Sequence, residues 1–312
     1  MNTEWDIIII GGGPAGLTAA QYAARANMKT VLLEKMSPGG QALMIDELEN
    51  YPGLCEPVDG FTFAEALTKQ AKKFGASIEL TGAASIDKKD NLFSVQTTNG
   101  AVLHGKAVIL TTGATHRPLG IPGEERLSGR GVSYCATCDG PFFKGKRIFV
   151  VGGGDTACTD AVYLANLSDD VTIVHRKDRF RAQKAVAQKV LSHPKIRTLF
   201  RTEIKEIKGT DKVESVVLFD NNDGRTYEEP ADAVFVFIGV SPHTETVPVL
   251  EKDPSGYIIT DAKMETSLPG LFCAGDVRSS PFRQVVVACA EGAIAAHAAE
   301  EYIEKMTGTD YR

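Results

Sequence analysis

Short apolar runs that end in glycines divide the start of the chain into alternating strands and helices. The run at 6–10 is short enough for a buried parallel strand and leads directly into the glycines at 11–13. The stretch at 17–27 predicts a helix, and TVLLE at 30–34 predicts a second strand. Because strand, glycine turn, helix and strand follow one another without interruption, the pattern predicts a βαβ unit with a parallel sheet.

The glycines of this unit have the spacing of a dinucleotide-binding turn, Gly11-x-Gly13-x-x-Gly16. In such a turn the first glycine permits the tight bend, the second lets the backbone approach a pyrophosphate, and the third lets the helix pack on the strand. The free N–H groups of the helix N-terminus bind phosphate. We expect Glu34, at the end of the second strand, to accept hydrogen bonds from ribose hydroxyls.

The same pattern recurs in the middle of the chain, where Gly152-x-Gly154-x-x-Ala157 follows an apolar run and VTIVHR at 171–176 predicts the next strand. From Gly11 to Glu34 is 23 positions, and from Gly152 to His175 is again 23. The acidic position is therefore a histidine here, and basic residues follow it at Arg176, Lys177, Arg179 and Arg181. A basic group at this place suits a ribose 2′-phosphate, whereas an acid suits a free 2′-hydroxyl.

Two dinucleotide sites in one chain are typical of an electron-transfer flavoenzyme, with FAD at one site and a hydride donor at the other. The first unit is expected to hold an ADP-ribose without a 2′-phosphate, and the second to prefer NADPH. The alternative for the basic run is a solvated turn without a ligand.

The first domain is not one contiguous block. A predicted helix at 61–75 and short strands at 92–105 precede the strand AVILTTG, and the Pro and Gly residues of RPLGIPGE resemble a linker. After residue 245 come a short strand that ends at Asp276 and a long helix from Arg283. We therefore predict an α/β protein with two Rossmann-like three-layer dinucleotide-binding domains, the second inserted into the first. The predicted parts are an FAD-binding domain at 1–116 and 246–312 and an NAD(P)H-binding domain at 117–245.

Composition excludes several classes of protein. The chain has 312 residues, 43% of them hydrophobic, and a net charge of −6, which argues against nucleic-acid binding. No apolar run is long enough to cross a membrane, and the start MNTEWDIIII has no features of a signal peptide. Six cysteines are too few for a disulfide scaffold, so we expect a reducing cytoplasmic compartment.

Cys135 and Cys138 form a C-x-x-C pair that is followed at once by Asp139. A zinc site needs four ligands, and the six histidines form no short-spaced pair that would supply the other two. A structural disulfide across so short a loop would restrict the unfolded chain only slightly. A redox disulfide explains the pair best, since C-x-x-C thiols at helix N-termini have lowered pKa values. Asp139 is a candidate proton shuttle, with a turn or N-cap aspartate as the alternative.

Together, GRGVSYCATCDG, the two glycine turns, HRKDRFR and CAGDVRSSPFRQVV resemble the low-molecular-weight thioredoxin reductases. The resemblance runs from about Asp6 to near the C-terminus. It implies a homodimeric enzyme in which NADPH reduces FAD, FAD reduces the cysteine pair, and the pair reduces thioredoxin. It also implies that Cys138 is the sulfur beside the flavin, that Cys135 attacks the thioredoxin disulfide, and that Asp139 is the acid–base residue.

The resemblance carries over to the cofactor sites residue by residue. The FAD site would comprise Gly11, Gly13, Ala15, Gly16, Glu34, Gly40, Gln41, Asn50, Asp276, Arg283, Gln284 and Val285. The NADPH site would comprise Gly154, Asp155, Thr156, His175, Arg176, Lys177 and Arg181.

Three positions depart from the family pattern. The family usually has an HRR triplet, and Lys177 replaces its last arginine. Lysine lacks the planar fork of arginine, so NADH remains possible beside NADPH. Asp155 stands where asparagine is common, and Thr159 where glutamate is often found. The alternatives that remain are a related flavin-dependent disulfide reductase with NADH or another electron donor, and a flavoprotein redox sensor that does not turn over.

Overall fold

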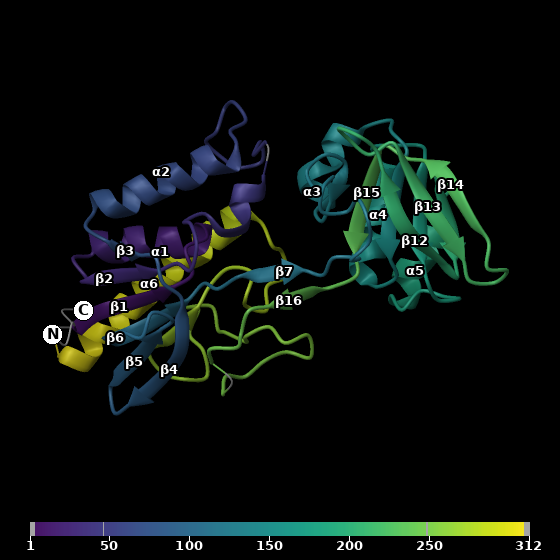
Figure 1. Cartoon of the computed structure of the whole chain (residues 1–312). Helices are drawn as coiled ribbons and strands as arrows, with labels where there is room; N and C mark the ends of the chain where they lie inside the picture. The colour runs from purple at the N-terminus through teal and green to yellow at the C-terminus, as the bar shows by residue number, and fades with distance from the viewer. Residues whose placement is uncertain (1–3, 46, 248, 309–312) are drawn as a thin grey trace. The chain divides into compact units, whose positions relative to one another are not determined.

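The computed structural model describes residues 4–45, 47–247 and 249–308. Two compact units make up the chain: unit 2 covers His116–Val240 and is inserted into unit 1, which breaks off at Thr115 and resumes at Ser241. The chain passes between them through β7 (Ala114–His116) and β16 (Val240–Pro242), which pair as a two-stranded sheet (Figure 1). The predicted α/β class, with a second Rossmann-like domain inserted into the first, is confirmed.

Unit 1 is built on a seven-stranded sheet in the order β3-β2-β1-β6-β5-β4, with β17 also paired to β6. The strands β1, β2, β3, β6 and β17 run parallel, whereas β4, β5 and the first half of β6 form an antiparallel meander. Their bounds are β1 (Glu4–Ile10), β2 (Thr30–Leu33), β3 (Ser77–Glu79), β4 (Ala83–Lys89), β5 (Leu92–Thr97), β6 (Val102–Leu110) and β17 (Leu271–Cys273).

Both faces of the parallel part of this sheet are buried, which is why its strands read as continuous apolar runs. In β1 the side chains of Ile7 and Ile9 enter the core beneath the helices, while Ile8 and Ile10 enter a second core on the other face. The alternation follows from the two-residue period of a strand.

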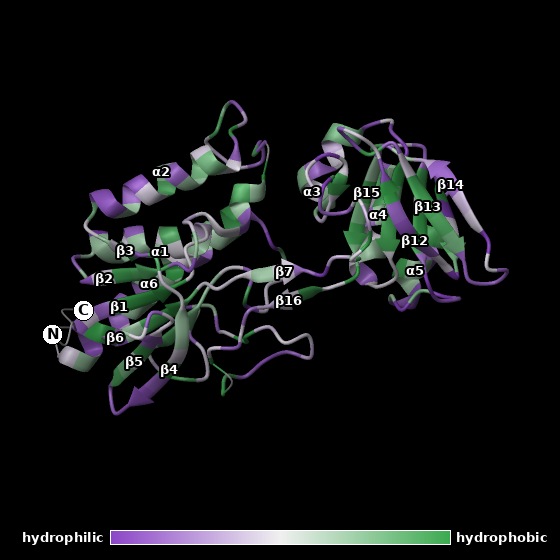
Figure 2. Ribbon diagram, in the orientation of Figure 1, coloured by the Kyte–Doolittle hydropathy of each residue, from purple (hydrophilic) through white to green (hydrophobic). Residues whose placement is uncertain are grey.

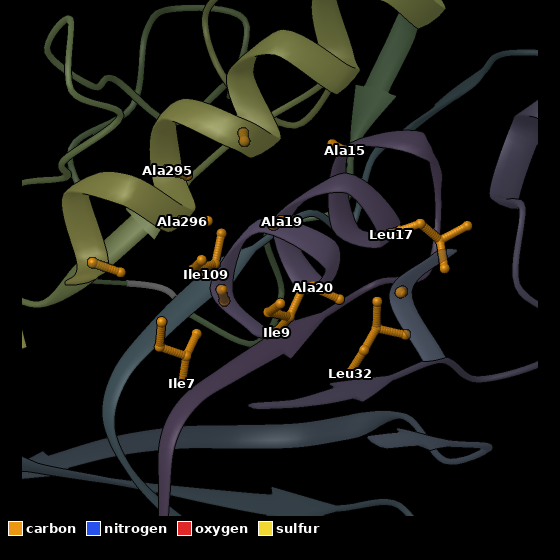
Figure 3. Packing of buried hydrophobic residues seen from close by; sticks show 14 of the residues in the cluster. Ile7, Ile9, Ala15, Leu17, Ala19, Ala20, Leu32, Ile109, Ala295 and Ala296 are labelled. Atoms are coloured by element: carbon orange, nitrogen blue, oxygen red, sulfur yellow. The ribbon is translucent and has the colours of Figure 1, made fainter. Parts of the chain in front are cut away.

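The helices of unit 1 are α1 (Pro14–Arg25), η1 (Gly40–Met44), α2 (Gly60–Lys73) and α6 (Val285–Thr307). The close-up of the core shows α1 and α6 above the sheet, with Ala19 and Ala296 among the small residues between them (Figure 3). Small side chains let the two helix backbones approach closely. The predicted first helix begins at Pro14 rather than residue 17, because proline suits the first helical position. The predicted C-terminal helix begins at Val285 rather than Arg283, because the backbone of Gln284 is extended.

Unit 2 repeats this architecture on a five-stranded parallel sheet in the order β11-β10-β9-β15-β8. The strands are β8 (Val132–Ser133), β9 (Ile148–Gly152), β10 (Val171–His175), β11 (Ile196–Phe200) and β15 (Ala233–Phe237). One core lies beneath α4 (Asp155–Ala165) and includes α5 (Lys184–Leu191) and the start of α3 (Ala136–Asp139), which η2 (Gly140–Phe143) follows.

The other face of this sheet is covered by a separate antiparallel sheet of β12 (Thr202–Lys208), β13 (Ser215–Asp220) and β14 (Thr226–Pro230). The pattern analysis did not predict this sheet. Figure 2 shows that apolar residues concentrate in the central strands of each unit, while the surface turns are mainly polar.

Candidate active site

The first glycine turn lies between β1 and α1, where the sequence predicted a dinucleotide-binding turn. Gly11 has a φ of +107°, and a Cβ at this position would meet the carbonyl oxygen of Thr111 at 2.3 Å. A Cβ at Gly16 would lie 1.9 Å from the carbonyl oxygen of Gly11. Around Gly13, by contrast, a Cβ would meet nothing within 4 Å. Glycine is therefore required by the protein at 11 and 16, whereas at 13 its absent side chain leaves space open in front of the helix N-terminus.

Glu34, the residue directly after β2, is hydrogen-bonded to this turn. Its Oε2 accepts a hydrogen bond from the backbone N–H of Gly12 at 2.7 Å, and its Oε1 accepts one from the N–H of Met36 at 2.9 Å. A carboxylate has about four acceptor positions. The two backbone bonds thus fix its orientation and leave it able to accept from ribose hydroxyls.

The other predicted residues of unit 1 contact several segments of that unit. A Cβ at Gly40, which begins η1, would lie 3.1 Å from the Cα of Gly13. The Gln41 amide donates to the carbonyl of Ala114. Asn50 donates from Nδ2 to Oε1 of Gln284 at 3.1 Å, although the two residues are far apart in sequence. Ala15 is buried in the first turn of α1.

Asp276 lies three residues beyond β17, which ends at Cys273, whereas the predicted strand ended at Asp276 itself. Burial raises the pKa of its carboxyl group, and the charge of Arg283 partly opposes that effect. The Arg283 guanidinium lies 3.9 Å from the ring centroid of Tyr257, and its buried Nε has no hydrogen-bond partner within the described residues. Gln284 caps α6 and Val285 is its first residue. An orphaned donor beside a helix N-terminus suits a polar, anionic ligand.

Glu291 is a residue that the sequence analysis missed in this region. It is buried, and it accepts hydrogen bonds from the N–H of Gly275 at 2.8 Å and from the Arg278 guanidinium at 2.5 Å. Because Gly275 directly precedes Asp276, this buried carboxylate fixes the turn that presents Asp276. The sequence showed no sign of it, since Glu291 lies within a helical segment of ordinary composition.

In unit 2, Cys135 and Cys138 are joined by a disulfide, with their Cα atoms 5.3 Å apart. Cys135 is the N-cap of the short helix α3, and its Sγ accepts a hydrogen bond from the N–H of Cys138 at 3.2 Å. Both cysteines are half-buried, and Thr137 between them is exposed. An N–H donor aimed at sulfur favours the thiolate, which is the reactive form in disulfide exchange.

Asp139, at the end of α3, makes no N-capping bond with its side chain. Its Oδ2 accepts a hydrogen bond of 2.6 Å from the hydroxyl of Ser133, a buried residue of β8. Asp139 thus occupies the N-cap position of η2, but its carboxylate is bonded to Ser133 and does not cap the helix. Ser133 was not recognised in the sequence, because a serine two residues before a cysteine carries no specific signal.

The second glycine turn, between β9 and α4, has the same construction as the first. A Cβ at Gly152, whose φ is +152°, would meet the carbonyl of Phe237 at 2.4 Å. A Cβ at Gly153 would come within 2.6 Å of three atoms of the His175 ring, and a Cβ at Gly154 would meet nothing within 4 Å. His175 thus closes this turn as Glu34 closes the first, and the third glycine again faces open space.

The basic segment after His175 folds back over this turn. The N–H of Arg181 donates to the carbonyl of Gly153 at 2.7 Å, and the N–H of Gln183 donates to Oδ1 of Asp155 at 2.8 Å. The exposed side chains of the segment and of the adjoining first turn of α4 include Arg176, Lys177, Arg179, Arg181, Asp155 and Thr156, together with Asp178, which pairs with Arg201.

His175 itself is buried, and its Nε2 has no hydrogen-bond partner in the described part of the chain. Burial lowers the pKa of the imidazole, and the positive charges of Arg181 and Arg176 lower it further. The ring is therefore predominantly neutral near pH 7. An unpaired ring nitrogen beside an open glycine and a cluster of positive side chains suits a nucleotide that carries an additional phosphate.

Both turns fit the cofactors that the sequence predicted, because each has an open glycine at a helix N-terminus. Each unit also contains an unpaired buried nitrogen, Arg283 Nε in unit 1 and His175 Nε2 in unit 2. Among the residues that the structure describes, no three His, Cys, Asp or Glu side chains are grouped to hold a metal ion. None of the described helices has the length and apolar character that a membrane crossing requires.

Comparisons with known proteins agree with these features. Residues 5–292 match the family model described as pyridine nucleotide-disulphide oxidoreductase. A protein of Treponema pallidum named thioredoxin reductase is 52% identical over 306 residues, which cover 98% of this chain and 99% of that protein. One from Peptoclostridium acidaminophilum with the same name is 45% identical, over 97% of this chain and 98% of that protein.

Solved structures give the same result. The thioredoxin reductase of Streptococcus pyogenes has a TM-score of 0.93 at 40% identity and is matched over 98% of this chain and 100% of that one. The thioredoxin reductase of Giardia duodenalis has a TM-score of 0.92 at 38% identity, over 97% of this chain and 99% of that one.

Proposed function

Because the chain belongs to the pyridine nucleotide-disulphide oxidoreductase family, and within it to the thioredoxin reductases, we propose that it reduces the disulfide of thioredoxin. The electrons pass from NADPH through FAD to the Cys135–Cys138 disulfide and then to the substrate. The observation that carries the proposal is this disulfide at the N-terminus of α3, within a chain that has two dinucleotide-type glycine turns.

The chain's own residues have distinct tasks in this assignment. When bound, NADPH supplies a hydride and FAD accepts it and passes on an electron pair. In unit 1 the open Gly13 and the N-terminus of α1 receive the FAD pyrophosphate, and Glu34 accepts from its ribose. The remaining FAD-binding residues are Gly11, Ala15, Gly16, Gly40, Gln41, Asn50, Asp276, Arg283, Gln284 and Val285.

In unit 2 the open Gly154 and the N-terminus of α4 receive the NADPH pyrophosphate. Arg176, Lys177 and Arg181 would hold the 2′-phosphate, and the unpaired nitrogen of His175 would be available to it. Asp155 and Thr156 line the same turn. Because Lys177 retains the positive charge, we expect NADPH to be preferred and NADH to be accepted at a lower rate.

The chemistry at the cysteines is a two-step exchange. Two electrons and two protons convert the Cys135–Cys138 disulfide into two thiols, with Cys138 as the sulfur that receives the electrons. The Cys135 thiolate then attacks the thioredoxin disulfide and forms a mixed disulfide, which Cys138 resolves. Thioredoxin leaves as a dithiol and the Cys135–Cys138 bond is restored. Asp139 transfers the protons that these steps require.

Two further properties complete the proposal: the protein acts as a homodimer, and it works in the cytoplasm. The first follows from the family, and the second from the scarcity of cysteines and the need to keep the redox thiols reduced.

The test uses the purified protein with its flavin, thioredoxin and each nicotinamide. NADPH is expected to bleach the flavin absorbance, and turnover with thioredoxin is expected to continue through many cycles. Cys138→Ser is expected to abolish turnover while FAD stays bound. Cys55→Ser is the matched control, because Cys55 is an exposed free cysteine outside the redox turn, and turnover should be unchanged.

The outcomes separate the alternatives. Failure of both NADPH and NADH to bleach the flavin would indicate another electron donor. Reduction of thioredoxin for a single cycle only would indicate a redox sensor. Full turnover by the Cys138→Ser protein would exclude the assignment of the cysteine pair.

A further inference from the structure

Ser133 is a buried serine at the carboxyl end of β8, two residues before the first cysteine of the redox disulfide. The residue is 4% exposed. It lies opposite Phe235 in the register of β8 with β15, so the sheet of unit 2 fixes its backbone. A buried hydroxyl must make hydrogen bonds, and those of Ser133 all go to the redox turn.

The Ser133 hydroxyl joins the two ends of that turn. Its Oγ lies 2.6 Å from Oδ2 of Asp139 and 3.3 Å from the carbonyl oxygen of Cys135, and it accepts the N–H of Cys135 at 3.1 Å. A hydroxyl has a single hydrogen to donate. That hydrogen goes to the Asp139 carboxylate, because this acceptor is much nearer and is charged.

We propose that Ser133 is a positioning residue for the thiol–disulfide reaction, whose hydroxyl holds the Asp139 carboxylate in a fixed place relative to the backbone of Cys135. The proposal rests on the proposed function, since it assigns a task within the same site. In this proposal Ser133 acts through Asp139 and the backbone of Cys135.

The hydrogen bond has a chemical consequence for the reaction. When the two thiols return to a disulfide, they deliver two electrons and two protons to the disulfide of the substrate, and Asp139 must take up and release a proton in each cycle. A donor to the ionised carboxylate favours that form. Without the Ser133 hydroxyl, the carboxylate would lose this donor, and Asp139 would take up its proton at a higher pH.

Ser168 offers a matched control in the same unit. It is 3% exposed, its Oγ donates to the carbonyl of Lys146 at 2.5 Å, and it accepts the N–H of Asp170 at 3.1 Å. Ser168 thus has the same burial and the same bridging pattern, but it bridges backbone groups of Lys146 and Asp170, and neither residue has a part in the proposed reaction. If Ser133 were merely structural, the loss of either hydroxyl would have the same effect.

The experiment measures thiol–disulfide exchange directly. The flavin-loaded protein, with Cys55→Ser to remove the exposed free thiol, is reduced with dithiothreitol, and its reaction with an aromatic small-molecule disulfide is followed from pH 5 to pH 9. For Ser133→Ala we expect a rate about tenfold lower near neutral pH and an acidic limb displaced to higher pH. Ser168→Ala is expected to keep the profile of the parent protein. Circular dichroism and flavin content confirm folding.

A combination with Asp139→Asn decides whether Ser133 acts through the carboxylate. In the Asp139→Asn protein, we expect Ser133→Ala to cause no further loss of rate. Multiplied losses, or a Ser133→Ala profile identical to that of Ser168→Ala, would overturn the proposal. If the alanine variant does not fold, Ser133→Thr and Ser133→Val repeat the comparison, because they share a shape and differ in the hydroxyl.

The same variants are then assayed with thioredoxin and NADPH. If the parent protein does not reduce thioredoxin with NADPH, the proposed function is wrong. This outcome is independent of the pH profile measured with the small disulfide. A displaced profile with Ser133→Ala would support the positioning role even then.

Discussion

Loss of one member of the buried ion pair between Arg278 and Glu291 is expected to destabilise unit 1 strongly. The exposed fractions of the two side chains are 13% and 8%. Glu291 accepts from Gly275 and Arg278, while Arg278 also donates from Nε to Thr260 at 2.8 Å. Glu291→Ala would leave the guanidinium buried without its counter-charge and the Gly275 N–H without an acceptor.

The magnitude follows from these contacts. Removal of one member of a buried pair costs about 3–5 kcal/mol, because the remaining charge is uncompensated. Replacement of both members by apolar residues of similar volume, Arg278→Met with Glu291→Leu, is often close to neutral. We therefore expect each single variant to lower the unfolding free energy by several kcal/mol, and the double variant to cost less than the sum.

Trp5 makes the assay specific to unit 1. It is the single tryptophan of the chain, it is 9% exposed, and it lies in β1. Urea unfolding of the flavin-free protein, followed by Trp5 fluorescence, reports unit 1 without a contribution from cofactor binding. Glu65→Gln serves as the control, because it breaks an exposed i,i+4 pair with Lys69 on α2. A cost below about 1 kcal/mol for Glu291→Ala, or strictly additive single costs, would refute the reasoning.

Two further predictions concern the open glycines and one buried acid. Gly13→Ala should fold and lose flavin, and Gly154→Ala should keep flavin and lose reduction by NADPH, because each Cβ would occupy space that the protein itself leaves open. Gly16→Ala should fail to fold, because its Cβ would clash with backbone. Flavin content and circular dichroism distinguish the three variants. Burial raises the pKa of Asp160 to about 6 from 3.8, so the folded state holds the proton more tightly than the unfolded chain, and stability falls as pH rises from about 4 to 6. Asp160→Asn should therefore stabilise unit 2 by about 2–3 kcal/mol at pH 8 and not below pH 4; equal unfolding midpoints for the two proteins at pH 8, measured by circular dichroism, would contradict this assignment.

The parts of the fold that depend on local pattern could be predicted from the sequence. The run before Gly11, the glycine spacing and the strand that ends at Glu34 all lie within 30 residues, and each element follows from its own periodicity. Contacts that join distant segments could not be predicted in this way. Asn50 meets Gln284 only because two loops of unit 1 converge, and the antiparallel sheet at 202–230 consists of short strands with mixed polarity.

Within the candidate site, the residues that react were predictable, whereas the residues that hold them in place were not. Cysteine pairs and open glycines are rare enough to be recognised from their spacing. Ser133, Glu291 and Glu124 are common residue types whose importance depends on burial and on partners. Glu124 shows this well: it is 3% exposed and accepts from the N–H groups of Leu119 and Gly120 and from the hydroxyl of Tyr134, the residue before Cys135.

The two glycine turns also suggest how one architecture would distinguish two nucleotides. In each unit, the residue at or just after the end of the second strand contacts the second glycine of the turn. Glu34 accepts a hydrogen bond from the N–H of Gly12, and the ring of His175 lies next to Gly153. The backbone is equivalent, so shape alone would not separate the ligands. The charge at this place is opposite, because a carboxylate fixed by two N–H groups stands in unit 1 and a neutral imidazole followed by basic side chains stands in unit 2. We therefore expect a ribose with a 2′-phosphate to be repelled from the first turn and attracted to the second.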